Sequence, residues 1–168
     1  MKDDGQVRKQ ATITFERHLP GPRERVWEFL TDSQHIADWF GGGPMKYEIE
    51  PRRGGSVSLA DDHIRGVVTQ WNPPSRLIYT WNVFSPGDFE SPFPESYVKF
   101  ELQSDGEQVL LTLTHLPVLE EYEGRTMMGW HTFLARLEAL VRGETPESRA
   151  VLMERHRIHY GVPEMGSR

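Results

Sequence analysis

The sequence of 168 residues contains no cysteine. Disulfide bonds, thiol nucleophiles and thiolate metal sites are therefore excluded from its chemistry. It has no apolar run close to the roughly 20 residues that a membrane-spanning helix requires. Residues 1–6 also lack the apolar stretch of a signal peptide. We therefore expect a cytoplasmic protein without a membrane partner.

The sequence also has no excess of positive charge. The formal net charge is −6, from 19 Lys and Arg against 25 Asp and Glu. Nucleic-acid binding draws its affinity from basic patches that neutralise phosphates, so no nucleic-acid partner is expected. The basic residues Arg149, Arg155 and Arg157 alternate with Glu147 and Glu154, which is typical of a solvated helix face.

The length and composition favour one globular domain. A chain of 168 residues can build one hydrophobic core, and it shows no internal repeat or low-complexity segment. Residues 1–10 are polar and are predicted to form a flexible N-terminal arm. The domain is predicted over residues 11–143, and residues 144–168 form a C-terminal helical extension.

Alternation of apolar and polar residues predicts most of the chain to be β-structure. Residues 11–19 alternate with period two, and the segment 20–22, Pro-Gly-Pro, ends this strand. Apolar residues at helical spacing then predict two short helices, ending near Leu30 and Phe40. Further strands are predicted by alternation around residues 47–49, 57–59, 64–71, 77–83, 98–102 and 109–115.

The pattern changes to helical spacing from about Glu121. One apolar stripe runs along the predicted helix: Met127, Trp130, Leu134, Leu137 and Val141. After Gly143, the segment 145–147, Thr-Pro-Glu, predicts a further helix through about His159. This helix carries four apolar residues that should be buried, namely Ala150, Val151, Leu152 and Ile158. We therefore expect it to pack on the domain or across a homodimer.

This order of elements predicts an α+β fold. We expect a curved antiparallel sheet of about six to seven strands wrapped around a long C-terminal helix, with two short helices after the first strand and an extra helix at the C-terminus. A strongly curved sheet cannot bury its concave face on itself. The long helix must cover that face, and any gap between helix and sheet is a cavity.

Eight short motifs in order carry a family resemblance. They are Arg17, Pro22 with Val26-Trp27, Thr31-Asp32, Trp39-Phe40, Arg53-Gly54-Gly55, Pro73 to Trp81, Leu113-Thr114-His115, and Gly129-Trp130 with Leu134. The chain resembles the activator of heat-shock protein 90 ATPase homologue family, within the START-like, birch-pollen-allergen-like superfamily. The match spans roughly residues 11–143 and implies the helix-grip fold. It implies no single activity, because members of the superfamily bind, carry, cyclise or scaffold.

The predicted site is the apolar wall between sheet and helix. Ten residues are placed on it: Trp39, Phe40, Trp71, Tyr79, Trp81, Phe100, Leu113, His115, Met127 and Trp130. Such a wall suits a small hydrophobic or aromatic molecule. The alternative is that these side chains simply fill the core, since aromatic residues are large and normally buried.

His115 is the candidate for chemistry within this wall. It shares a strand face with Leu111 and Leu113, so its ring is expected under the helix, where a histidine can act as acid or base. The alternative is a core histidine bonded to a backbone carbonyl. A metal site made by His115 and His131 would need a third ligand, such as His63, and no sequence spacing predicts one, so no metal and no cofactor is predicted.

Three functions follow as hypotheses. The first is non-enzymatic binding of a small hydrophobic molecule. The second is a protein-interaction role with a chaperone partner, which the family resemblance implies. The third is an enzyme resembling the cyclases or hydrolases of the superfamily, using His115 or an arginine such as Arg17.

Overall fold

The computed structural model describes residues 4–164 and confirms the α+β fold. One antiparallel sheet has the strand order β1-β7-β6-β5-β4-β3-β2. Its strands are β1 (Ala11–Pro20), β2 (Glu48–Ile49), β3 (Ser56–Leu59), β4 (Ile64–Asn72), β5 (Arg76–Val83), β6 (Ser96–Asp105) and β7 (Gln108–Val118). The helices are α1 (Arg23–Thr31), α2 (Ser33–Phe40), the 3-10 helix η1 (Glu120–Tyr122), α3 (Glu123–Val141) and α4 (Arg149–His159).

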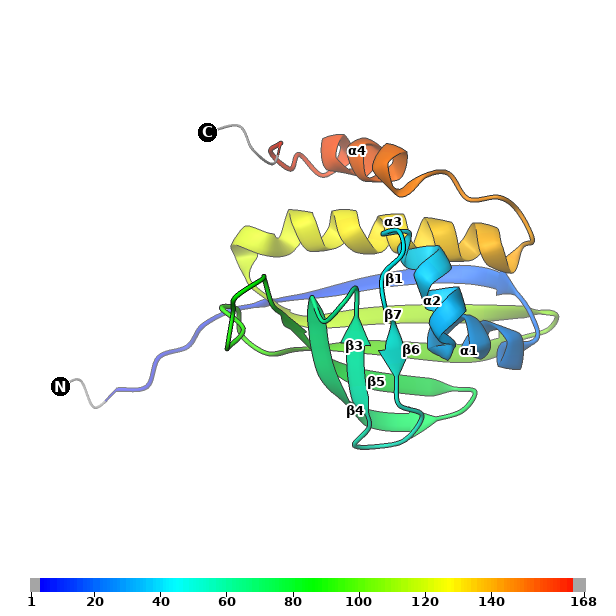
Figure 1. Ribbon diagram of the computed structural model, residues 1–168, viewed down its shortest axis with the longest axis horizontal. Coiled ribbons are helices and arrows are strands. Elements are labelled where there is room, and N and C mark those ends of the chain that lie inside the picture. The colour runs from blue at the N-terminus through cyan, green and yellow to red at the C-terminus, as the bar shows by residue number, and fades with distance from the viewer. Residues whose placement is uncertain (1–3, 165–168) are drawn as a thin grey trace.

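The sheet curves beneath α3, as expected for a helix-grip fold (Figure 1). The 19 residues of α3 run along the sheet, and their apolar stripe faces it. Trp130 and Leu137 are 2% and 1% exposed, so the roof of the fold is closed over most of its length. The buried stripe of α3 follows the helical spacing that the sequence predicts.

The concave face of the sheet supplies the other half of the core. Phe100 on β6 lies between Leu77 on β5 and Leu113 on β7, and all three are fully buried. Alternate residues of these strands point to the helix because side chains of a strand alternate between its two faces. The predicted inward face of these three strands is therefore confirmed.

The helices α1 and α2 close one end of the sheet (Figure 1). The side chain of Asp32 caps α2 by accepting hydrogen bonds from the backbone N–H groups of Gln34 and His35. The indole of Trp39 donates to the carbonyl of Phe29 over 2.8 Å, which locks α2 against α1.

The helix α4 lies on the side of α3 that faces away from the sheet (Figure 1). It begins at Arg149 with Ser148 as its cap, so the predicted start near residue 146 is wrong. The reason is local: the Ser148 hydroxyl accepts from Val151 N, whereas Glu147 stays outside the helix and pairs with Arg155.

Burial of the apolar residues of α4 is also less complete than expected. Leu152 is buried, but Ala150 is exposed and Val151 and Ile158 are 51% and 65% exposed. The helix therefore uses one narrow face against α3. The homodimer stays a prediction.

Within residues 4–164 we find no helix with the length and apolar character needed to span a bilayer.

Candidate functional site

A cavity of about 400 Å³ lies between the sheet and the N-terminal half of α3. The strands β5, β6 and β7 form its floor, α3 its roof, and the segment before η1 one side. Its walls are mostly apolar and are built by Trp81, Val83, Phe93, Pro94, Ser96, His115, Pro117, Val118, Leu119, Tyr122, Thr126, Gly129, Trp130 and Phe133.

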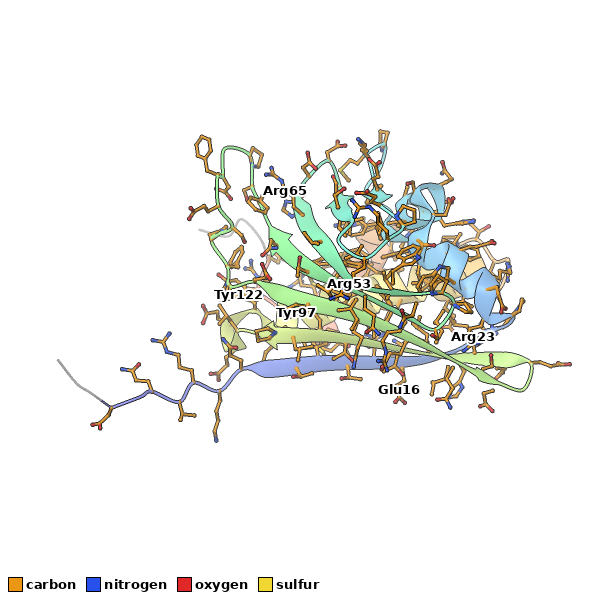
Figure 2. All side chains as sticks on the ribbon, turned by 90° about the horizontal axis from the view of Figure 1, so that it is seen from below. Glu16, Arg23, Arg53, Arg65, Tyr97 and Tyr122 are labelled. Carbon is orange, nitrogen blue, oxygen red and sulfur yellow. The ribbon has the colours of Figure 1, made fainter. Side chains whose placement is uncertain are left out.

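The rim of the cavity is at the end of the molecule from which the N-terminal arm leaves. Figure 2 shows Tyr122 at this end and Arg23, at the start of α1, at the other. Gln10, His63 and Arg125 belong to the lining and are exposed, so they mark the mouth. The cavity therefore opens between the arm, the β3–β4 turn and the first turn of α3.

Two aromatic rings narrow one side of this mouth. Phe93, from the loop between β5 and β6, meets Tyr122 of η1 edge to face, with 5.0 Å between ring centroids. Edge-to-face contact is a favoured arrangement of aromatic pairs. Deeper inside, Trp81 and Trp130 lie 5.3 Å apart, and Trp130 meets Phe133 at 5.7 Å.

Three of the ten predicted site residues line this cavity, namely Trp81, His115 and Trp130. Five of the others are buried elsewhere in the core: Trp39, Phe40, Tyr79, Phe100 and Leu113. Trp71 packs edge to face on Trp27, and Met127 packs against the core. These seven side chains therefore pack in or against the hydrophobic core, which is the alternative to a ligand-binding wall given above.

A chain of hydrogen bonds crosses the inner wall of the cavity. The indole Nε1–H of Trp130 donates to Nδ1 of His115 over 2.9 Å. The other ring nitrogen, Nε2, lies 2.9 Å from Oγ of Ser96, and this hydroxyl donates to the carbonyl of Trp81 over 3.0 Å. An indole can only donate, so Nδ1 must accept and the neutral ring carries its proton on Nε2. Each bond in the chain therefore has a fixed direction.

Burial lowers the pKa of His115 to about 4. The ring is 5% exposed and lies 5.6 Å from the ring of Trp81. It is therefore neutral at pH 7. The expected alternative of a core histidine describes it well, but its partners are two side chains and not a backbone carbonyl.

Sequence reasoning missed several lining residues. Phe133 follows Trp130 by one helical turn, and this spacing was the available signal for it. Ser96 is brought to the site only because it pairs with Trp81 across β5 and β6. Phe93 comes from the loop between β5 and β6 and Tyr122 from the three-residue helix η1, and no periodic pattern marks either residue.

Of the other candidates for chemistry, His63 lies at the mouth of the cavity, whereas His131 and Arg17 lie away from it. The ring of His131 stacks on that of His156, with 3.8 Å between centroids, at the contact of α3 with α4. Arg17 lies over the ring of Phe15 and is outside the cavity lining. Among residues 4–164, no group of three or more His, Cys, Asp or Glu side chains is arranged to hold a metal ion.

The fold is shared with several solved structures. CalU16 from Micromonospora echinospora is 23% identical, with a TM-score of 0.69 over 89% of this chain and 86% of that one. The protein encoded by gene BPP1335 from Bordetella parapertussis is 27% identical, with a TM-score of 0.68 over 99% and 93%. PFC0360w, an HSP90 activator from Plasmodium falciparum, is 21% identical, with a TM-score of 0.64 over 81% and 99%.

Comparison with curated proteins gave no match. The family model described as "Activator of Hsp90 ATPase homolog 1-like protein" matches residues 20–142 and so covers most of the domain described above. The sheet, its roofing helix and the motif order agree with this match, and the chain belongs to the Activator of Hsp90 ATPase homolog 1-like protein family.

Proposed function

We propose that this protein binds a small hydrophobic or aromatic molecule in the cavity between the sheet and α3, without catalysing a reaction. The supporting observation is the cavity itself, about 400 Å³ with Trp81, Trp130 and Phe133 in its wall. Concave sites of this size with mostly apolar walls are typical of small-molecule binding.

A glycine in the roof adds to this argument. Gly129 lies in the interior of α3 and lines the cavity. A Cβ built on it would meet only the ring of Phe133, at 3.9 Å, which is ordinary contact. Glycine in a helix interior costs about 1 kcal/mol relative to alanine. No close neighbour requires this glycine, and its effect is to keep the cavity wide.

The experiment is a titration of the full chain with 2-methylnaphthalene, an apolar bicyclic probe, followed by calorimetry and thermal unfolding. Binding to the folded state should raise the melting temperature with probe concentration, as mass action requires. Gly129→Leu places an isobutyl group in the cavity and should weaken binding at least tenfold. The wild-type chain showing no saturable binding would contradict the proposal.

A control separates cavity filling from a general change in the chain. Val151 is 51% exposed on α4, away from the cavity, so Val151→Leu adds apolar bulk elsewhere. This variant should bind the probe as the wild type does. Equal weakening in both variants would show that the effect of Gly129→Leu is not local.

An enzyme using His115 is less well supported. A general base needs a free lone pair, but Nδ1 of His115 already accepts from Trp130, and Nε2 carries the proton directed to Ser96. Ser96 in turn donates to the Trp81 carbonyl, so its proton is not directed to the imidazole. The direction of the bonds is the reverse of that in a serine nucleophile activated by histidine.

Interaction with a chaperone is the second candidate function. It is favoured by the family description and by the likeness to an HSP90 activator. A change in the ATPase rate of a purified Hsp90 on addition of this protein would support it. An unchanged rate over a range of protein concentrations, with no complex on gel filtration, would contradict it.

A further inference from the structure

Three polar side chains of the cavity lining share one property: Ser96, Thr126 and His63 each direct a proton of their own to a backbone carbonyl. Ser96 Oγ donates to the Trp81 carbonyl at 3.0 Å, and Thr126 Oγ1 donates to the Tyr122 carbonyl at 2.8 Å. Nδ1 of His63 lies 2.7 Å from the Phe84 carbonyl, which can only accept, so this nitrogen carries the proton.

The hydrogen-bonding position of Ser96 that is left for a ligand is therefore an acceptor lone pair. A serine hydroxyl has one proton and two acceptor positions. Its proton is directed to Trp81, and one acceptor position receives Nε2–H of His115. The direction of this second bond is set by Trp130, whose indole occupies Nδ1. Ser96 is 6% exposed and lines the cavity, so an incoming group meets an acceptor there.

Free acceptor positions are also found nearer the mouth of the cavity. Thr126 keeps its acceptor positions after donating to Tyr122. Donors reach the lining from Arg125 and Gln10, which are both exposed at the rim, and from the indole N–H of Trp81 and the hydroxyl of Tyr122. At the inner wall beside His115, the group that Ser96 offers to a ligand is an acceptor.

We propose that the cavity selects neutral aromatic molecules that donate a hydrogen bond, such as phenol-type hydroxyl compounds, with Ser96 Oγ as the acceptor. This inference rests on the proposed function. A ligand with only acceptors, such as an ether or a carboxylate, would set its lone pairs against those of Ser96 and lose its hydrogen bonds to water. The aromatic part would lie against Trp81 and Trp130.

The test compares matched probes on the full wild-type chain by calorimetry at pH 7. The probes are 2-naphthol, which donates; 2-methoxynaphthalene, which only accepts; 2-methylnaphthalene, which does neither; and 2-naphthoate, which is anionic. We expect 2-naphthol to bind about two- to tenfold more tightly than the methyl compound, the effect of one net hydrogen bond. The methoxy compound should bind no better than the methyl compound.

The variant Ser96→Ala tests the assigned acceptor. It removes the lone pair and leaves Nε2–H of His115 without its partner, so the site changes from acceptor to donor. The preference for 2-naphthol over 2-methoxynaphthalene should disappear or reverse. Thr69→Ala is the control, because Thr69 donates to the Ile78 carbonyl from an exposed position on β4, outside the cavity lining.

The outcomes are distinct. Equal binding of the naphthol, methoxy and methyl probes would overturn the donor preference while leaving the proposed cavity function intact. Tighter binding of 2-naphthoate or 2-methoxynaphthalene than of 2-naphthol would overturn it in favour of the donor groups of the lining. An unchanged preference in folded Ser96→Ala would overturn the assignment to Ser96. Binding of none of the probes would overturn both this inference and the proposed function.

Discussion

Nε1–H of Trp130 donates to Nδ1 of His115 over 2.9 Å, and this bond joins the middle of α3 to β7. The two rings also meet edge to face at 6.2 Å between centroids. Both side chains are buried, so the bond is protected from water. The roof of the cavity is thus held to its floor by a directed contact as well as by apolar packing.

The variant Trp130→Phe should lower the free energy of unfolding by about 1–3 kcal/mol, because it keeps an aromatic ring but leaves Nδ1 of His115 buried without a donor. Urea unfolding measures the change. Nitrogen chemical shifts of His115 should change as well, since the indole no longer fixes the tautomer. Unchanged shifts and an unchanged urea midpoint would contradict the role given to this bond.

Stability should also depend on pH through histidines, above all His115 and His131, and burial lowers the pKa of His156 as well. Burial is the main cause that lowers the pKa of both His115 and His131 to about 4, from an ordinary value of 6.5. For His131, the neighbouring His156, Arg17 and His159 lower the pKa further. Between about pH 4 and 6.5 the unfolded chain therefore binds more protons than the folded one. The free energy of unfolding rises with pH in this window and is fully developed above it.

Denaturant unfolding between pH 5 and 7 measures this dependence. For the buried His115 the slope is at most about 1.4 kcal/mol per pH unit. The variant His131→Gln removes one of the two groups and should reduce the slope while preserving its sign. Glu50, Glu147 and Glu154 have pKa values lowered by hydrogen bonds, so they remain ionised across this range. A flat profile in the wild type would refute the prediction.

The contribution of α4 is tested by two adjacent residues. Leu152 is 3% exposed and faces α3, whereas Val151 is 51% exposed. Leu152→Ala should cost about 2 kcal/mol and speed hydrogen exchange in α4, because it leaves a cavity at the helix contact. Val151→Ala should change stability by less than about 0.5 kcal/mol. Similar effects of the two substitutions would show that α4 does not dock as described.

Substitution of alanine for two of the glycines should change the stability of the protein in opposite directions. A Cβ at Gly66 would lie 1.9 Å from the carbonyl oxygen of Thr80 on the neighbouring strand, so Gly66→Ala must push β4 from β5. We expect a loss of about 3 kcal/mol or more. Gly129→Ala meets only Phe133 at 3.9 Å and should stabilise α3 by about 1 kcal/mol. Thermal unfolding of both variants gives the comparison, and the same sign in both would contradict it.

The fold was predictable because its signals are local. Alternation in β5, β6 and β7 and the stripe from Trp130 to Val141 each arise within one element. The start of α4 was predicted less well, since Thr145 and Ser148 are both capping residues and the sequence pattern does not rank them. The structure places the cap at Ser148.

The site was predicted only in part. The inward direction of Trp81, His115 and Trp130 followed from periodicity, and the same reasoning gave Tyr79 and Phe100, which are core residues. Whether an inward side chain meets a gap or another side chain depends on how α3 lies across the sheet. That position is set by packing of segments distant in the sequence.

The amino-acid sequence by itself determined which faces of the strands and helices are apolar, and hence a curved sheet roofed by a long helix. Only the tertiary structure decided that a gap of about 400 Å³ lies under Gly129, and that Ser96 stands beside His115. The physical reason is that periodicity sets the direction of a side chain within its own element, whereas strand register and helix placement set its neighbours.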